Sequence, residues 1–481
     1  MPKFAQAQNA GNKTVYNSNS QPAPSIAWID ASAFWTQGNS PDLCTIVNGI
    51  LTSATGYGTY PATGAVIDAR GLYHINGGQI TCSNSPFYGL TASPPPTTIL
   101  LPASTIPMSA TWTLPNNTKL VGAGQNTNLE WAGGSSGYMI EMGSATFCPS
   151  TGCNSIGIEH LVLVDSGSLG GIDNKWSQDA SYVNDVFFSM FSGTGISIAA
   201  PSSSPYYPGA TNSGPYSNIG FNSASSGTPV CIDVETQTRG IHGATCFGNT
   251  NTSATQGNAA IYVNASNNSI EDIHIEEFWD GIEVGNIPSG AVVGNIVISN
   301  INGYGSNAEG GLLTNVVHIC GVNNNPNLPF GECSKNNNTT HGGIVSDVTI
   351  LQAANLNPGY PTPGGTVLQD DQTGTTIQGC PGTTNGCENP LTAGLYILGE
   401  ATGGVTGSYS RFATNPSYPN SVRPQSSYVP TWSVGSNTSV NGSSCHTPGA
   451  LYSNTLGDSG NSFTIYVCTY SGTAFSWQPL V

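Results

Sequence analysis

Residues 260–286 read AIYVNASNNSIEDIHIEEFWDGIEVGN, and this stretch decides the fold. It contains two kinds of segment. AIYV and GIEV are short runs with apolar residues at alternating positions, whereas NNSIEDIHI places a polar pair inside an alternating apolar run. Both patterns are typical of β-strands with one buried face. The stretch also holds six carboxylates in a chain of which only 7% is charged: Glu271, Asp272, Glu276, Glu277, Asp280 and Glu283.

The short strand pattern recurs along the chain as GGIDNKW, TGISIA, VCIDVET, AIYVNA, DGIEVGN and VVHICG. Its middle residues, 21 to 36 positions apart, are Asp173, Ser197, Asp233, Tyr262, Glu283 and His318. We call this set the outer column. A single coil of this kind cannot bury its apolar face, so successive coils must stack, with connecting loops of variable length. The pattern therefore predicts parallel strands roughly 4.8 Å apart.

The second pattern recurs in NSIGIEHLVLV, ASYVNDVFF, PYSNIGF, TRGIHGATC, AVVGNIVI and GIVSDVTI. Its polar positions align in one column: His160, Asp185, Asn218, Gly243, Asp272, Asn295 and Asp347. Amides and carboxylates at such a turn satisfy backbone groups and rarely react. We expect this column to be structural. By the same alignment, Glu276, Glu277 and Asp280 are expected at a solvated bend, which leaves Glu283 as the one carboxylate of the opening stretch on the outer column.

These repeats predict an all-β chain whose main part is a right-handed parallel β-helix. We place the N-terminal segment and cap at residues 1–100, the β-helix at 101–400, and a linker with a small C-terminal β module at 401–481. Residues 40–51, SPDLCTIVNGIL, have the apolar spacing of a short helix, with Ser40 expected as its N-cap and Pro41 at its first helical position. We expect that helix to cover an open end of the solenoid.

Composition excludes several classes of partner. The formal net charge is −17, with nine Lys and Arg in total, so nucleic acid is not expected to bind. A polyanionic substrate is disfavoured too, unless a cation bridges it to the protein. No apolar run approaches the roughly 20 residues of a membrane helix, so membrane insertion is not expected.

Twelve cysteines fall into six neighbouring couples along the chain: Cys44 and Cys82, Cys148 and Cys153, Cys231 and Cys246, Cys320 and Cys333, Cys380 and Cys387, and Cys445 and Cys468. An even count suggests disulfides and an oxidising compartment. Nearest-neighbour pairing is a hypothesis, since the sequence does not fix connectivity. The start MPKFAQAQNAGNKT has no apolar core segment, so we expect a secreted protein whose signal peptide has been removed.

Three segments carry a family resemblance: AVIDARGL (65–72), TWTLPNNTKLVGAG (111–124) and NNSIEDIHIEEFWDGIEVGN (267–286). They resemble bacterial pectate-lyase-superfamily proteins, which are related to family 28 glycoside hydrolases. The resemblance covers roughly residues 25–400 and the C-terminal tail. It implies a right-handed parallel β-helix and, commonly, polysaccharide cleavage, although one fold hosts many functions.

The chain departs from the motifs of both families. Family 28 enzymes carry Asn-x-Asp, Asp-Asp, Gly-His-Gly and Arg-x-Lys motifs. Here the pair Asp370-Asp371 is followed by neither of the last two, and GIHG around His242 is a partial match. Pectate lyases use calcium and a basic residue, and few basic residues are present. No catalytic residue is therefore carried over from the resemblance.

The outer column is the candidate site. Strand alternation points Asp173, Asp233, Glu235 and Glu283 away from the core, toward solvent, and we predict that they are catalytic. Asp173 and Asp233 lie two coils, or roughly 9–10 Å, apart, and so do Asp233 and Glu283. This is near the carboxylate spacing of inverting glycosidases. Residues expected to bind substrate are Lys175, Trp176, Tyr206, Tyr207, Arg239, Tyr262 and His318.

Several alternatives stay open on the sequence. The acidic residues are equally compatible with a solvated face. Lys175 and Arg239 are either lyase bases or sugar ligands, or they form salt bridges with Asp173 or Glu235. The leading expectation is a secreted glycoside hydrolase that needs no cofactor. The alternatives are a polysaccharide lyase, for which calcium is possible, and a non-catalytic carbohydrate-binding or adhesin β-helix.

Overall fold

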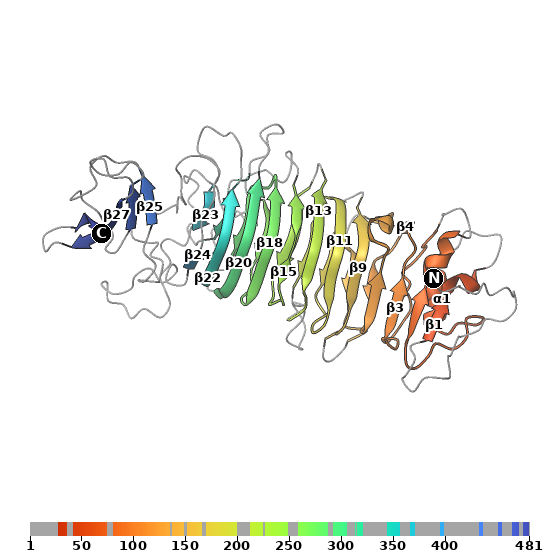
Figure 1. The fold of residues 1–481 in the computed structure, drawn as a ribbon. Helices are drawn as coiled ribbons and strands as arrows, with labels where there is room; N and C mark the ends of the chain where they lie inside the picture. Colours follow the sequence, from red (N-terminus) through yellow and green to blue (C-terminus); the bar gives the residue numbers. More distant parts are fainter. Residues whose placement is uncertain are drawn as a thin grey trace, which may run out of the picture. The chain divides into compact units, whose positions relative to one another are not determined.

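A computed structural model gives the structure of the protein (Figure 1). The residues it describes are 27–35, 42–74, 80–134, 137–148, 152–165, 170–199, 212–224, 227–248, 258–286, 292–304, 313, 315–320, 344–355, 366–370, 395–398, 432–435, 451–454, 464–470 and 475–480. By internal contacts the chain divides into two compact units, residues 1–422 and 423–481. The domain boundaries expected from the sequence stay a prediction.

Two parallel sheets make up the described part of the first unit. The first sheet has 15 strands among the described residues: β1 (Ala27–Asp30), β2 (Ala65–Asp68), β3 (Thr97–Leu100), β4 (Thr105–Met108), β6 (Thr118–Val121), β7 (Asn128–Trp131), β9 (Gly157–Val164), β11 (Tyr182–Phe191), β13 (Tyr216–Ser223), β15 (Ile241–His242), β16 (Thr245–Phe247), β18 (Asn268–Glu276), β20 (Val292–Tyr304), β22 (Ile344–Asn355) and β24 (Leu395–Leu398).

The second sheet has nine described strands: β5 (Trp112–Leu114), β8 (Tyr138–Met142), β10 (Gly170–Asn174), β12 (Thr194–Ile198), β14 (Val230–Val234), β17 (Ala259–Val263), β19 (Asp280–Val284), β21 (Asn315–Ile319) and β23 (Thr366–Asp370). From β8 to β24 the chain alternates between the two sheets, one coil after another. This all-β, parallel arrangement is consistent with the predicted parallel β-helix, and its right-handedness stays a prediction.

Short helices and a separate sheet complete the description. They are the 3₁₀ segments η1 (Ala31–Phe34), η2 (Arg70–His74) and η3 (Gly124–Asn126), the α-helix α1 (Leu43–Leu51), and β25 (Trp432–Gly435), β26 (Leu451–Asn454), β27 (Thr464–Tyr470) and β28 (Phe475–Leu480). Strands β25–β28 form a four-stranded sheet in the second unit, with one parallel and two antiparallel pairs.

Helix α1 lies beside the β1 end of the first sheet (Figure 1). Its apolar residues are buried as their spacing predicted. The predicted N-cap is wrong, because the side chain of Asp42, not Ser40, accepts the hydrogen bond of the Thr45 amide at 2.7 Å. The first helical position is therefore Leu43 and not Pro41 as predicted. Asp42 also accepts from the Ser83 amide, and Cys44 is bonded to Cys82, so the helix start is anchored to the following segment.

The disulfide hypothesis is confirmed for three couples, Cys44–Cys82, Cys148–Cys153 and Cys231–Cys246. The last of these joins β14 in the second sheet to β16 in the first. Cys320 is also disulfide-bonded. The remaining predicted couples include residues outside the described part of the chain.

Strands of the first sheet bend at residues in the left-handed region. In β11 both Val183 and Val186 are buried, although three positions separate them, because Asp185 has φ 54° and shifts the alternation. His160, Asn218, Gly243 and Asp272 share this conformation at aligned positions. The structural role predicted for this column is thereby supported.

Two members of that column, Asn295 and Asp347, are misplaced: they are level with one another but not with Asp272. The register pairs Glu271 with Ser299 and Ile273 with Ile301, so Asp272 is level with Asn300 rather than with Asn295. The Asn300 amide donates to Asp272 Oδ1 at 2.6 Å. Asn295 instead donates to Asn267 at 2.7 Å, in a separate row at the strand start. Two Asn positions five residues apart satisfy the same sequence pattern, which is why alignment alone chose the wrong one.

In the second sheet, too, the inward–outward alternation of side chains is interrupted, at Gly281, directly before the buried Ile282. A Cβ on Gly281 would meet the Ile275 side chain at 3.1 Å, so position 281 faces the core, and the next residue, Ile282, is in the core as well. Two consecutive inward residues interrupt strict alternation. As a consequence, Asp280 and Glu283, on either side of this pair, both point away from the main core.

Candidate functional site

The strand register aligns the whole outer column. Asp173 pairs with Ser197, Ser197 with Asp233, Asp233 with Tyr262, Tyr262 with Glu283, and Glu283 with His318. The column predicted from the sequence is therefore a continuous row across adjacent strands. It extends further than predicted, to Glu141 before Asp173 and to Gln369 after His318.

The expectation that this row faces solvent is wrong for most of its members. Asp173 is 5% exposed, Tyr262 3%, and Glu283 and His318 are fully buried. These side chains leave the main core but are covered on the outside of the sheet. Tyr262, for example, forms a small apolar cluster of its own with Val230 and Ala259. Asp233 is half-buried, and Glu235 is exposed as predicted.

A first group of ionisable residues surrounds Asp173. Lys175 Nζ donates to Asp173 Oδ2 at 2.7 Å and lies 5.7 Å from the centre of the Tyr138 ring. The salt bridge proposed for Lys175 is thus confirmed. Burial raises the pKa of Asp173 above 3.8, although the hydrogen bond and charge of Lys175 lower it in part. Burial likewise raises the pKa of Tyr138, which is hydrogen-bonded to Ser197.

The two partners of the Asp173–Lys175 pair respond differently to burial. For Asp173, whose side chain is 7% exposed, the cost of desolvating the carboxylate exceeds the gain from the ion pair, so its pKa rises. For Lys175, whose side chain is 44% exposed, burial is the largest single influence and lowers the pKa, but the hydrogen bond and charge of Asp173, with smaller contributions from nearby groups, together outweigh it and raise the pKa above 10.5. The result is a carboxyl group that keeps its proton to higher pH than an ordinary aspartate.

A buried hydrogen-bond network fixes the backbone next to Asp173. Asn174 is fully buried, and its amide donates to the hydroxyl of Tyr216 in β13 at 2.7 Å. The same side chain accepts from the Ser177 amide at 3.0 Å. The hydroxyls of Tyr216 and Ser213 are 2.8 Å apart, and burial raises the pKa of Tyr216 to about 12, so this phenol stays neutral. The network ties the end of β10 to the first sheet and holds Asp173 in place.

The raised pKa of Asp173 gives a testable pH dependence of stability. A carboxyl group with a higher pKa in the folded than in the unfolded state binds its proton more tightly when folded, so its ionisation on raising the pH destabilises the fold. We expect the midpoint of thermal unfolding to fall from pH 3.8 upward through the raised pKa of Asp173, and this fall to be absent in Asp173→Asn. Calorimetric melts across this range measure it.

The matched control is Asp185→Asn, because Asp185 is exposed and pairs with His160 on the other sheet. In this variant the midpoint of thermal unfolding should fall with rising pH as it does in the wild-type protein. A stability profile in Asp173→Asn that parallels the wild type over the same range would show that Asp173 ionises normally.

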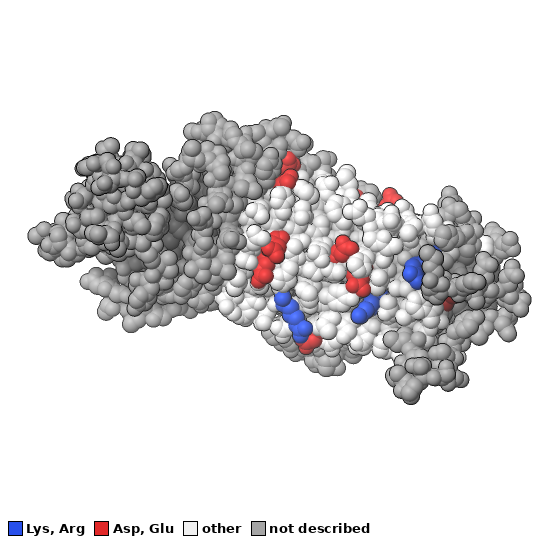
Figure 2. All heavy atoms as spheres, in the orientation of Figure 1, with Lys and Arg blue, Asp and Glu red and all other residues white. Residues whose placement is uncertain are grey.

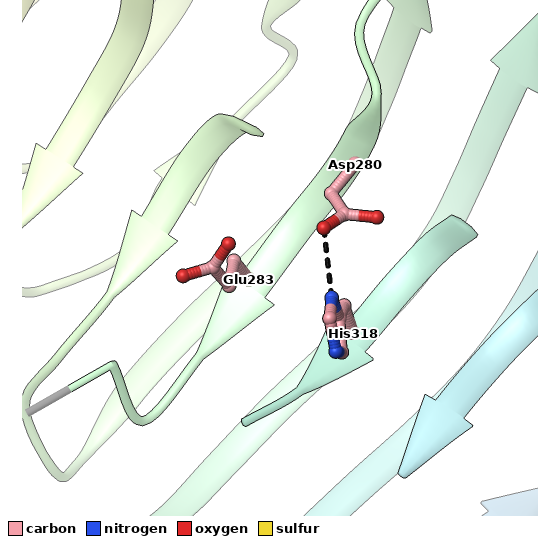
Figure 3. A group of neighbouring side chains, drawn as sticks. All are labelled: Asp280, Glu283 and His318. Atoms are coloured by element: carbon pink, nitrogen blue, oxygen red, sulfur yellow. Dashed lines mark hydrogen bonds and ion pairs between the residues drawn. The ribbon is translucent and has the colours of Figure 1, made fainter. Parts of the chain in front are cut away.

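A second group lies at the other end of the row, on β19 and β21. His318 Nδ1 is 2.7 Å from Asp280 Oδ2, and Glu283 lies on the strand beside His318 (Figure 3). All three side chains are fully buried, and one possible ligand atom from each lies within 4.8 Å of the others. The amide of Asn286, 5% exposed, donates to Glu283 Oε1 at 2.6 Å. These are the residues of the described chain that are suited to hold a metal ion.

Asp280 is the residue that the sequence analysis missed. It was expected at a solvated bend, whereas it is fully buried and paired with His318. The signal was the small residue before each isoleucine, as in Gly171, Gly195 and Gly281. A small residue at this position lets two successive positions face inward, which brings Asp280 to the same side as Glu283.

The other residues predicted to bind substrate do not gather at one place. Trp176 is half-buried against the main core. Arg239 pairs at 3.0 Å with Asp179, not with Glu235. Tyr206, Tyr207 and Asp371 lie outside the described residues, and for Asp370 only the backbone of β23 is described. Figure 2 shows that charged side chains are sparse on the described part of the face in view. The site roles assigned from the sequence stay predictions.

Comparisons with known proteins give only remote likenesses. No family model matches the chain, and no curated protein matches its sequence. Among solved structures, ORF18 of Geobacillus virus E2 is similar over 72% of this chain at 12% identity, with a TM-score of 0.35, and the chain spans 61% of its length. The A-module of mannuronan C-5 epimerase AlgE4 of Azotobacter vinelandii is similar over 80% of this chain and 98% of its own, at 11% identity and a TM-score of 0.34. The A-module of AlgE6 from the same organism covers 71% of this chain and 98% of its own, at 11% identity and a TM-score of 0.28.

These likenesses do not assign the chain to a family. Membership of the pectate-lyase superfamily stays a prediction. No helix among the described residues is long and apolar enough to cross a membrane. The disulfides are compatible with an extracellular protein.

Proposed function

We propose that the protein is a secreted glycoside hydrolase that cleaves a polysaccharide, with Asp173 as general acid and Asp233 as general base. The observation that supports this is the register, which places the two residues on the same face with Ser197 on the strand between them. Two strand steps separate the residues by roughly 9.6 Å. Inverting glycosidases space their carboxyl groups at about this distance, because a water molecule must fit between base and sugar.

The two carboxyl groups have environments suited to different roles. Burial raises the pKa of Asp173, so it can carry a proton. Once Lys175, which covers it at 2.7 Å, moves aside on sugar binding, Asp173 would donate this proton to the glycosidic oxygen as that bond breaks. The half-buried Asp233 accepts a proton from the attacking water, whose oxygen bonds to the anomeric carbon from the opposite face. The product would have inverted configuration. Ser197 and Tyr138, which are hydrogen-bonded to one another beside Asp173, are positioned to contact the sugar.

Charge favours a neutral polysaccharide as substrate. Glu141, Asp173 and Asp233 lie on β8, β10 and β14 of one face, Glu235 follows directly after β14, and the chain has a formal net charge of −17. A polyanionic glycan would be repelled by this face.

Elimination by a lyase is the second candidate. It needs a basic group that removes a proton from the sugar, and the two basic candidates are both in ion pairs, Lys175 with Asp173 and Arg239 with Asp179. These pairs favour hydrolysis. Perturbed carboxyl groups concentrate at catalytic sites, which favours an enzyme over a purely binding β-helix.

The test is incubation of the purified protein with a panel of neutral and acidic glycans. New reducing ends and unsaturated sugars are measured separately, and the anomer first formed is identified by NMR. We expect reducing ends of inverted configuration from a neutral glycan and no unsaturated product. Unsaturated ends would establish a lyase instead, and tight binding without any cleavage would establish a binding module.

A further inference from the structure

A buried group on β19 and β21 has the composition of a metal site. Asp280, Glu283 and His318 are fully buried, and one ligand atom from each lies within 4.8 Å of the others (Figure 3). Burying two carboxylates side by side is costly unless positive charge accompanies them. A protonated His318 supplies one such charge, whereas a divalent cation offsets both carboxylates while the imidazole stays neutral.

A fourth possible ligand, an amide oxygen, is present beside these three. Asn286 is 5% exposed and is held against Glu283 by its amide nitrogen at 2.6 Å. Its carboxamide oxygen Oδ1 is buried and has no hydrogen-bond partner among the described residues. A buried amide oxygen without a donor is unfavourable by about 1–3 kcal/mol, and a metal ion would use its lone pair. This observation is independent of the acidic pair and points to a ligand.

The donor set selects the kind of ion. Calcium takes six to eight oxygen ligands at about 2.3–2.6 Å, and an imidazole nitrogen does not fit that set. Carboxylate oxygen with imidazole nitrogen is typical of zinc, which binds four ligands tetrahedrally at about 2.0–2.2 Å. Ligand atoms around zinc are then about 3.4 Å apart. That lies between the 2.7 Å from Asp280 to His318 and the 4.8 Å limit of the group, so small side-chain shifts suffice.

We propose that Asp280, Glu283 and His318, with Asn286 as fourth ligand, bind a Zn²⁺ ion. Full burial and four protein ligands are the features of a structural rather than a catalytic zinc site. Because β19 and β21 are adjacent strands from successive coils, the ion would brace the solenoid at this point. The site goes beyond the hydrolase proposal and is independent of it, since Asp173 and Asp233 are on other strands.

The experiment measures zinc in the full-length protein. Wild-type protein, stripped with a chelator, is reloaded with Zn²⁺ and passed over a desalting column, and bound metal is determined by mass spectrometry. Affinity comes from competition with a chromophoric chelator. We expect one Zn²⁺ per chain, a higher thermal midpoint in its presence, and no such gain with Ca²⁺. A folded wild-type protein that retains no Zn²⁺ overturns the proposal.

Variants locate the ion. Glu283→Gln and Asp280→Asn, which keep side-chain volume, are each expected to weaken Zn²⁺ affinity by at least about 100-fold, and Asn286→Ala by about 10-fold. His160→Gln is the matched control, since His160 forms an exposed pair with Asp185 at the same 2.7 Å. Unchanged affinity in both carboxylate variants overturns the proposal.

If the variants of these buried residues do not fold, the coordination of Co²⁺ bound to the wild-type protein tests the proposed site instead. Its visible absorption reports coordination geometry, and we expect the intense bands of a four-coordinate site. The weak bands of a six-coordinate, hydrated ion overturn it.

Discussion

Asp173→Asn is expected to lower kcat/KM for a natural glycan by about 10²–10⁴-fold, because it removes the group that protonates the leaving sugar. Asp233→Asn should lower it by a similar factor, because the attacking water is no longer activated. Initial rates of reducing-end release on the glycan identified from the panel measure both effects. The two substitutions change no side-chain volume, so circular dichroism and melting should show a folded protein in each case.

A substrate with a better leaving group distinguishes the general acid from the general base. An aryl glycoside whose phenol has a low pKa needs no protonation to depart. Asp173→Asn should therefore recover most of its activity on this substrate, whereas Asp233→Asn should recover none. The ordinary polysaccharide and the aryl glycoside of the same sugar form the matched pair of substrates.

Asp185→Asn is the control variant, because this exposed residue pairs with His160 on the first sheet and lies outside the proposed site. Its activity should match that of the wild type within about twofold. Wild-type activity in Asp233→Asn would exclude Asp233 as general base. Equal recovery of both variants on the aryl glycoside would show that the acid and base roles are wrongly assigned.

The pH profile gives a further check on the same pair. Activity requires a deprotonated Asp233 and a protonated Asp173, so kcat/KM should be bell-shaped. Burial raises the pKa of Asp173, which moves the alkaline limb above the range of an ordinary aspartate. Two interacting carboxyl groups titrate as a pair, so neither limb of the profile reports the pKa of one residue alone. The limbs of the wild-type profile are therefore compared with those of each variant.

The alignment of residues across adjacent strands could be predicted from the sequence, because each stacked coil repeats the same pattern of apolar and polar residues. A short strand with a central isoleucine recurs, and its register is confirmed from Asp173 to His318. Nearest-neighbour disulfides were predicted correctly at three couples, since cysteines close together in the sequence, 5 to 38 residues apart, also lie close together in space. Such local and periodic features need no knowledge of the tertiary structure.

Burial of the outer column was not predictable in the same way. Alternation shows that Glu283 and His318 point away from the core, but not whether anything covers them. Both are fully buried. Strand patterning determines the side of the sheet on which a residue lies, whereas exposure depends on contacts between segments distant in sequence.

Strict alternation also hid Asp280. Counting back from Glu283 by twos gives Gly281, so alternation does not put Asp280 on the outer face, and Asp280 was expected at a solvated bend. The break before Ile282 reverses that assignment. The same kind of error placed Asn295 level with Asp272, where the register puts Asn300. Local departures from ideal strand geometry are therefore what sequence patterns predict least well.

Gly281 is the residue on which the break between Asp280 and Glu283 depends. A Cβ at this position would lie 2.5 Å from the backbone oxygen of Val316 on the adjacent strand and 3.1 Å from the Ile275 side chain. The oxygen belongs to the backbone of a packed strand, so it cannot move aside as the end of a flexible side chain does. Overpacking of this kind is destabilising by about 1–3 kcal/mol and occasionally more.

We expect Gly281→Val to lower the free energy of unfolding by about 3 kcal/mol, at the upper end of this range, because it adds a branched side chain where even one methyl group clashes. Gly281→Ala should be intermediate. Chemical denaturation followed by circular dichroism measures the loss. Strand β19 would have to move away from β21, so the Asp280–His318 contact should also be lost.

Gly134→Ala is the matched control, since a Cβ there meets nothing within 4 Å. It should be neutral or slightly stabilising, because alanine has less backbone freedom to lose on folding than glycine. A Gly281→Val protein as stable as the wild type would contradict the inward direction of position 281. The shared outward face of Asp280 and Glu283 follows from that direction, so the same result would also remove the geometric basis of the proposed zinc site.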